Sequence, residues 1–528
     1  MDSLIVRSIF ITLKTLNNWY EHSITYRFIE WIRILVVQSF FIGPIHRYAV
    51  NKSDRDYLAG SFLIGFPIRI FSVVISLFKR LFLWIANINK NSVNRKIFLF
   101  FAEPWSRPNS FTNILKTSIP CRIINWLCAD FKFSFLSIFI LFMSIVPDVL
   151  WSNWFIVIAA VFFVTFFILN YFLGNNSGLD KKYIFSSLLV YILFAIISFF
   201  TGFGGMDSVR VAVIMFSSII ISVLIPNLVD TKEKFENLVF VILISLVLTS
   251  LYGFLQVYMG IEINAAFVDL YAHAGLPGRL YSTMGNPNNY AKFVTMLLPF
   301  CVSFAILAKS TFKKIFLFAM ISPVLIALAL TFSRASYLAL AGIAFVYILL
   351  IMPRLIPIGI FLAILAIPFV PQVIIDRIAT VGTDTSSLYR VWIWEGSWNV
   401  IQSYWSSGIG IGPHAFNMIY RAYTRAEASN AMHAHNVFLN IWIEVGITGF
   451  IAMIIYNISL AKTGISSFFD DQTELKFYIA AGVSSLFGFI MFSMVEHVWF
   501  YPRTMLTYFL LTGMILALAR IQEKSKEV

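Results

Sequence analysis

From Phe133 onward, long apolar segments follow one another almost without interruption, and this pattern restricts the fold more than any other feature of the chain. A helix that spans a bilayer needs about 20 mainly apolar residues. Twelve such segments lie near 133–147, 151–173, 183–202, 209–227, 237–259, 288–308, 315–331, 335–352, 355–373, 436–460, 476–496 and 502–520. Charged residues make up only 12% of the chain, against about 25% in soluble proteins. We therefore predict an all-α integral membrane protein with about 12 transmembrane helices.

Basic residues occur in alternate loops between these segments. Short loops rich in Lys and Arg face the cytoplasm. The basic positions are Lys181/Lys182, Lys232/Lys234, Lys309/Lys313/Lys314, Arg354, Lys462/Lys476 and Arg520 to Lys526. The pattern predicts that both termini are cytoplasmic. The loops predicted to face outward lie near 259–288, 332–334, 374–435 and 497–501, of which 374–435 is the largest.

The first 130 residues form a separate region in which basic side chains outnumber acidic ones. Polar residues such as Arg69, Ser72, Ser76 and Lys79 recur there at helical intervals beside a wide apolar face. Helices of this kind lie in the membrane interface and bind anionic lipid headgroups. We expect residues 1–130 to form amphipathic helices on the cytoplasmic face, followed by the polytopic core 131–528. The alternative is that 62–88 crosses the membrane.

The composition indicates neither a nucleic-acid-binding protein nor a protein built on disulfides or zinc. The net charge of +13 is not gathered in a soluble basic patch, so no nucleic-acid partner is expected. The three cysteines, Cys121, Cys128 and Cys301, form no CxxC pattern. Neither a disulfide framework nor a zinc site is therefore indicated.

Two arginines in the outward loops are candidates for anion binding. Arg279 precedes the turn Gly285–Asn288, in which Asn286 or Asn288 fits the role of a helix cap. Arg334 lies where two spans almost meet, and a charge held near the membrane in this way indicates function. Arg279 could instead extend to water along the membrane surface. Together, the two arginines predict a site for a phosphate or diphosphate.

The run His433-Ala434-His435-Asn436 ends the largest outward loop and leads into the span 436–460. A neutral histidine at the mouth of a helix can act as a general base near neutral pH. No third ligand has a spacing that supports a metal site, and a simpler interpretation is that His435 caps the next helix beside Asn436. Glu444, about two turns further on, is either a structural anchor or a catalyst.

Two further features lie in the same outward loop. The residues around Arg390 and Trp394 belong to a stretch, 388–403, that we expect to form an amphipathic helix on the membrane surface. The glycines between 408 and 412 do not form a nucleotide-binding loop, because no Lys-Ser/Thr pair follows them.

These residues together resemble the signature of the O-antigen ligase and O-antigen polymerase superfamily. His435-Asn436, nine residues, and then Gly446-x-x-Gly449 resemble its main motif. Arg279 with the turn after it, Thr331-x-Ser333-Arg334, and Arg390-x-x-x-Trp394 resemble further family blocks. The resemblance covers about residues 180–515, so the basic first 130 residues lie outside it.

The resemblance implies a GT-C-like glycosyltransferase of the bacterial cytoplasmic membrane. Such enzymes transfer a glycan from undecaprenyl diphosphate to an acceptor hydroxyl on the outer face, with inversion and without a metal or other cofactor. By the same resemblance, Arg279 and Arg334 would bind the diphosphate and His435 would deprotonate the acceptor. The residues that would support them are Arg390, Asn436, Glu444 and Asn286.

The resemblance leaves several functions open. Ligases often carry a Thr-Thr pair after the glycine motif, whereas Phe450 follows Gly449 here. This departure favours a polymerase of polysaccharide repeat units over a ligase that acts on a cell-surface acceptor. The alternative from another class is a transporter or flippase of a lipid-linked or anionic substrate, although the two halves show no convincing repeat. His433 and His497 have no assigned role.

Overall fold

The computed structural model describes residues 130–172, 181–260, 278–366 and 385–527, together with positions 368, 372, 375 and 382. Every regular element in this part of the chain is a helix. The predicted amphipathic region 1–130 lies outside the described residues except for its last position, and so does the possible span 62–88. Parts of the loops 259–288 and 374–435 also lie outside them.

An apolar helix corresponds to each of the predicted spans. Eight are long and apolar enough to cross a membrane: α11 (Gly205–Leu228), α12 (Lys232–Tyr258), α13 (Pro287–Leu307), α14 (Thr311–Ala329), α15 (Arg334–Ile351), α20 (Val437–Asp470), α21 (Leu475–Ser493) and α22 (Pro502–Glu527). The other four predicted spans correspond to the apolar helices α8 (Phe131–Ile145), α9 (Trp154–Phe172), α10 (Ser186–Thr201) and α16 (Ile356–Ala366). The predicted polytopic, all-helical membrane fold is confirmed.

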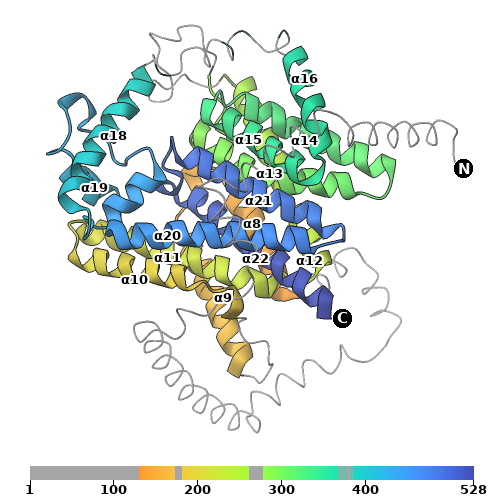
Figure 1. The fold of residues 1–528 in the computed structure, drawn as a ribbon, viewed down its shortest axis with the longest axis horizontal. Helices are drawn as coiled ribbons and strands as arrows, with labels where there is room; N and C mark the ends of the chain where they lie inside the picture. Colours follow the sequence, from red (N-terminus) through yellow and green to blue (C-terminus); the bar gives the residue numbers. More distant parts are fainter. Residues whose placement is uncertain are drawn as a thin grey trace, which may run out of the picture.

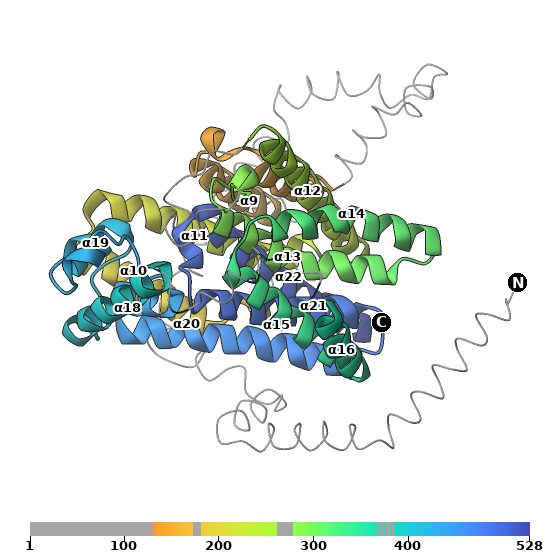
Figure 2. The ribbon, with the colours of Figure 1, turned by 90° about the horizontal axis from the view of Figure 1, so that it is seen from above.

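Helix α22 forms the centre of the bundle, and 94% of its most apolar window is buried by other helices. It packs mainly against α11, and also against α20 and α21 (Figure 2). The buried hydroxyls of Ser222 and Thr512 form a 2.7 Å hydrogen bond between α11 and α22. Tyr508 stacks on Phe489 of α21, with ring centroids 4.1 Å apart. Both contacts lie in the N-terminal half of α22, and the start of this helix borders the candidate site.

The helices run largely along the long axis, with α18 (Thr385–Tyr404) and α19 (Pro413–Tyr420) at one end and the C terminus at the other (Figure 1). Ion pairs at the C-terminal end join the loops that are predicted to be cytoplasmic. They are Lys182–Glu523 at 2.6 Å, Lys232–Glu474 at 2.8 Å and Lys526–Asp470 at 3.5 Å. The loops near 182, 232 and 474 and the C-terminal segment, all predicted to be cytoplasmic, therefore meet at one end of the bundle.

A small second core covers the opposite end. In this core, Ile393 and Val400 of α18 and Phe416 of α19 are buried together with Ile443 near the start of α20. Helix α18 spans the stretch 388–403 that was expected to form a helix. The end of the bundle that carries α18 and α19 is called the α18 end below.

Candidate active site

Glu496, in the turn after α21, is the centre of a polar cluster at the α18 end. Its side chain is 7% exposed. One carboxylate oxygen, Oε1, accepts hydrogen bonds from Arg390 Nη2 at 2.6 Å and Asn288 Nδ2 at 3.2 Å. The other, Oε2, lies 3.5 Å from His435 Nδ1 and 3.7 Å from Lys292 Nζ. One carboxylate thus gathers side chains from α13, from α18 and from the residues that precede α20.

These neighbours keep Glu496 ionised. Burial alone would raise the pKa of the Glu496 carboxyl, because the charged form loses hydration. The charges of Lys292 and Arg390, followed by the contact with His435, outweigh burial and hold the pKa well below its usual range. The cluster therefore contains a permanent negative charge beside His435 at neutral pH.

His435 is held by its own chain in an unusual backbone conformation. Its φ is 46°, in the left-handed region that non-glycine residues rarely adopt. Its amide donates to Nδ1 of His433 at 3.2 Å, and the amide of Ala434 donates to Oδ1 of Asn440 at 2.9 Å. Because Nδ1 of His435 faces Glu496, the other ring nitrogen, Nε2, is the one that can exchange a proton with a substrate. The side chain is 26% exposed.

His433 and His497 are neutral neighbours of His435. The ring centroid of His433 lies 4.1 Å from that of His435, 5.4 Å from that of His497 and 4.3 Å from that of Phe500. Burial, together with the charges of Lys292 and His435, lowers the pKa of His497 to about 3. Burial and the other two histidines lower the pKa of His433 well below its usual value. Within the described residues, no group of three or more His, Cys, Asp or Glu side chains has the arrangement of a metal site.

Arg279 connects a second predicted motif to the cluster. Its side chain is buried, Nε donates to the Thr331 carbonyl at 2.8 Å, and Nη2 donates to Oδ1 of Asn288 at 2.9 Å. The amide of Leu280 donates to the carbonyl of Leu330 at 3.0 Å. The backbone at 279–280 therefore lies beside the backbone at 330–331. Asn288 joins this pair of segments to Glu496.

Arg334 is the first residue of α15, three residues beyond the carbonyl that Arg279 holds. Phe332, between them, turns the chain with a φ of 49°. Arg334 is partly exposed, at the helix terminus whose free amides favour anions. The two predicted arginine motifs thus form one corner of the α18 end.

Asn286 and Asn436 cap helices. Oδ1 of Asn286 accepts from the amides of Asn288 and Asn289, at the start of α13. Oδ1 of Asn436 accepts from the first free amides of α20, at 2.9 and 3.1 Å. Its Nδ2 also donates to the carbonyl of Met494, two residues before Glu496. These caps orient the segments that carry Asn288 and His435.

Gly446 interrupts α20 with a φ of 73°. The interruption frees two helical carbonyls, which accept hydrogen bonds from the glycine-rich loop instead. The carbonyl of Ile443 accepts from Ile409 at 2.9 Å, and that of Glu444 accepts from Gly410 at 3.2 Å. Gly446 therefore marks the point where this loop crosses α20.

The side chain of Glu444 anchors the same loop. Its Oε1 accepts from the amide of Gly412 at 2.9 Å. The same loop approaches α20 so closely that a Cβ at Gly446 would lie 2.2 Å from the carbonyl oxygen of Ser406, closer than any relaxed structure allows. Of the two roles that the sequence left open for Glu444, the structure shows the contacts of an anchor.

Sequence reasoning did not single out Lys292 or Arg503. Lys292 lies in α13 with a side chain 2% exposed, and Arg503 lies in the first turn of α22 with a side chain 5% exposed. Both are charged residues inside predicted spans, which is itself a signal of function. That signal was present in the sequence, but it could not name their partners.

Residues 315–454 match the family model described as O-antigen ligase, Wzy_C. The matched range begins in α14 and includes Arg334, Arg390, His435 and Gly446. The resemblance to the O-antigen ligase and polymerase family is thereby confirmed, and residues 315–454 carry its domain. A comparison with curated proteins gave no match. Glu496, Lys292 and Arg279 lie outside the matched range and reach the site through the fold.

Proposed function

We propose that this membrane protein of the O-antigen ligase type transfers a glycan from undecaprenyl diphosphate to an acceptor sugar hydroxyl at the α18 end, on the outer face of the bacterial cytoplasmic membrane. The family match supports glycan transfer in general. One observation carries the finer proposal. A continuous series of contacts runs from Arg279 through Asn288 and Glu496 to His435, so an anion-binding arginine and a base belong to one network.

In the proposed reaction, Nε2 of His435 removes the proton of the acceptor hydroxyl. The acceptor oxygen attacks the anomeric carbon opposite the diphosphate, and the bond from that carbon to the phosphate oxygen breaks. Direct displacement inverts the anomeric configuration. Arg279 and Arg334 stabilise the charge that develops on the leaving diphosphate, as fixed cations do in other transferases, and no metal is required.

Glu496 acts through His435. The proton that His435 accepts makes its ring a cation, and the carboxylate 3.5 Å from Nδ1 stabilises that cation. Arg390 and Lys292 keep the Glu496 carboxylate ionised and in position. Glu496 is therefore proposed as a positioning residue and His435 as the catalytic base.

Phe450 supports a polymerase of repeat units over a ligase. Phe450 follows Gly449 directly, at the position where ligases often carry the first residue of a Thr-Thr pair. Its ring stacks on that of Trp442, with ring centroids 5.2 Å apart. We further propose that both termini are cytoplasmic and that residues 1–130 lie against anionic lipid headgroups.

The test is a reconstituted assay with the lipid-linked oligosaccharide of the producing strain, read out as glycan chain length. Arg334→Ala should weaken donor use, whereas Arg354→Ala, in the 3-10 turn after the other end of α15, should behave like the wild type. Added EDTA should leave the rate unchanged. Equal activity of the two arginine variants would contradict the diphosphate assignment. Transfer that persists in Arg334→Ala while substrate translocation stops would indicate a transporter instead.

A further inference from the structure

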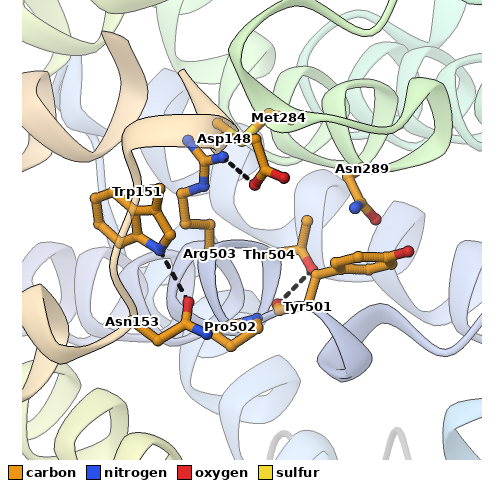
Figure 3. Close-up of a pocket in the computed structure, with 9 residues that line it drawn as sticks. All are labelled: Asp148, Trp151, Asn153, Met284, Asn289, Tyr501, Pro502, Arg503 and Thr504. Atoms are coloured by element: carbon orange, nitrogen blue, oxygen red, sulfur yellow. Dashed lines mark hydrogen bonds and ion pairs between the residues drawn. The ribbon is translucent and has the colours of Figure 1, made fainter. Parts of the chain in front are cut away.

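A cavity of about 250 Å³ lies between the α8–α9 turn and the start of α22 (Figure 3). Asn289 lines it, and Asn288, the next residue along the first turn of α13, contacts Glu496. The cavity is therefore adjacent to the candidate active site. A water molecule takes roughly 30 Å³ in the liquid, and pockets for larger ligands reach roughly 300–1,000 Å³. The volume fits one small polar ring rather than a lipid or a whole oligosaccharide.

Asn289 provides an unused hydrogen-bond donor in the wall of this cavity. The residue is 2% exposed, and its Nδ2 makes no hydrogen bond of normal length to the described residues, with only a weak interaction with the Tyr501 hydroxyl. In Figure 3 its amide group points toward the side of the cavity where Tyr501 lies. A buried donor without an acceptor is unfavourable, so an oxygen of a bound molecule would complete it.

The charges around the cavity favour a neutral ligand. Arg503 donates to the carbonyls of Val146 and Thr283 at 2.8 Å each and to Oδ1 of Asp148 at 2.7 Å. Its guanidinium also lies 4.9 Å from the ring centroid of Trp151. The positive charge is therefore already balanced, and an anion would meet the carboxylate of Asp148, whose side chain is 57% exposed.

The other side chains of the cavity suit a molecule rich in hydroxyl groups. Asp148 and Asn153 offer oxygens that accept hydrogen bonds, whereas Asn289 offers a donor. Trp151 and Tyr501 add aromatic rings, on which the C–H faces of a sugar can pack. The combination of aromatic rings and side-chain amides around a neutral space fits a sugar ring.

We propose that this cavity binds one neutral sugar residue of the glycan substrate and helps to select it, an inference that rests on the glycan transfer proposed above. Lys292 links the two sites, because its Nζ lies 3.4 Å from Oδ1 of Asn289 and 3.7 Å from Oε2 of Glu496. A sugar at Asn289 would lie one side chain away from the carboxylate that faces His435. The glycan would then extend from the cavity to the site of bond formation.

The first experiment compares steady-state transfer by Asn289→Leu with that by Asn399→Leu, an exposed asparagine of α18. Asn289→Leu keeps similar volume but removes the amide. It should raise KM about tenfold for one substrate, with little change in kcat. The substrate affected shows whether the sugar belongs to the donor or to the acceptor. Unchanged KM values for both substrates would overturn the sugar site, even if His435→Ala abolishes transfer as proposed.

A binding experiment covers the case in which Asn289→Leu does not fold. Hydrogen exchange of 148–153 and 501–504 is measured in the inactive His435→Ala protein, with and without the glycan that mild acid releases from the lipid-linked donor. Slower exchange in both segments, reversed by Asn153→Ala, supports the sugar site. Exchange that the glycan does not alter overturns it. If His435→Ala still transfers glycan while the glycan protects both segments, the proposed base is wrong but the sugar site stands.

Discussion

Replacement of Glu496 by Gln tests whether one carboxylate holds the candidate site together. Removing one partner of a buried ion pair costs roughly 3–5 kcal/mol. The side chains of Arg390 and His435 are 24% and 26% exposed, so water can hydrate them once the carboxylate is neutral. Only Lys292, at 2% exposed, would stay buried without a counter-charge. Because two of the three charged partners can be hydrated, we expect the lower end of the range, a loss of about 3 kcal/mol in the free energy of unfolding at pH 7.

The assay is unfolding of the detergent-solubilised protein by added SDS, with Glu427→Gln, an exposed carboxylate of the same half of the chain, as the matched control. The pKa of Glu496 is depressed in the folded protein, so its stabilisation is fully present above the unfolded pKa of about 4.3 and is lost as the pH falls through the folded value. The difference between wild type and Glu496→Gln should therefore narrow below about pH 4.

A second substitution makes the reasoning refutable. Lys292→Met in the Glu496→Gln background removes the buried cation that has lost its counter-charge, so it should recover part of the lost stability. The account of the cluster is wrong if Glu496→Gln costs no more than Glu427→Gln. It is also wrong if the loss from Lys292→Met simply adds to the loss from Glu496→Gln.

Three further substitutions probe the supports of the site. Gly446→Ala places a Cβ against a backbone carbonyl at a positive φ. Thermal unfolding should therefore show that the free energy of unfolding falls by at least about 2 kcal/mol. The control Gly359→Ala in α16, where a Cβ would meet open space, should be nearly neutral. Asn436→Ala should cost about 1 kcal/mol as a lost cap, and Asn436→Ser should restore most of it; equal stability of the two would contradict the capping role. The folded protein should lose stability as pH falls from about 6.5 towards the folded pKa of His497, about 3, because only the unfolded chain binds that proton. A stability profile of His497→Phe with the same slope in that range would show that other groups cause it.

The membrane fold was predictable because apolar length and basic loops act locally. Each predicted span, such as 209–227 or 436–460, needed only its own composition to be recognised. The helix start at Asn286 was also predictable, whereas the cap suggested at His435 is formed by its neighbour Asn436. Both kinds of signal are contained within about 20 neighbouring residues.

The partners within the site were not predictable, because they come from distant parts of the chain. His435 was singled out by its motif. Glu496, which faces it, follows only after α20 and α21 in the sequence. Lys292 was hidden in an apolar span whose composition it barely changes. The break at Gly446 depends on the loop at 406–410, which lies far from it in the sequence but contacts α20, and the sequence contains no local signal for such an approach.

The most direct test of the central claim is the rate of glycan transfer by His435→Ala, compared with His433→Gln, in the purified and reconstituted protein. A general base contributes roughly 10²–10⁴-fold to a rate. The account predicts that His435→Ala lowers kcat by about 10³-fold while donor binding persists, and that His433→Gln retains most of the activity. Normal extension of the glycan chain by His435→Ala would contradict the assignment of the base.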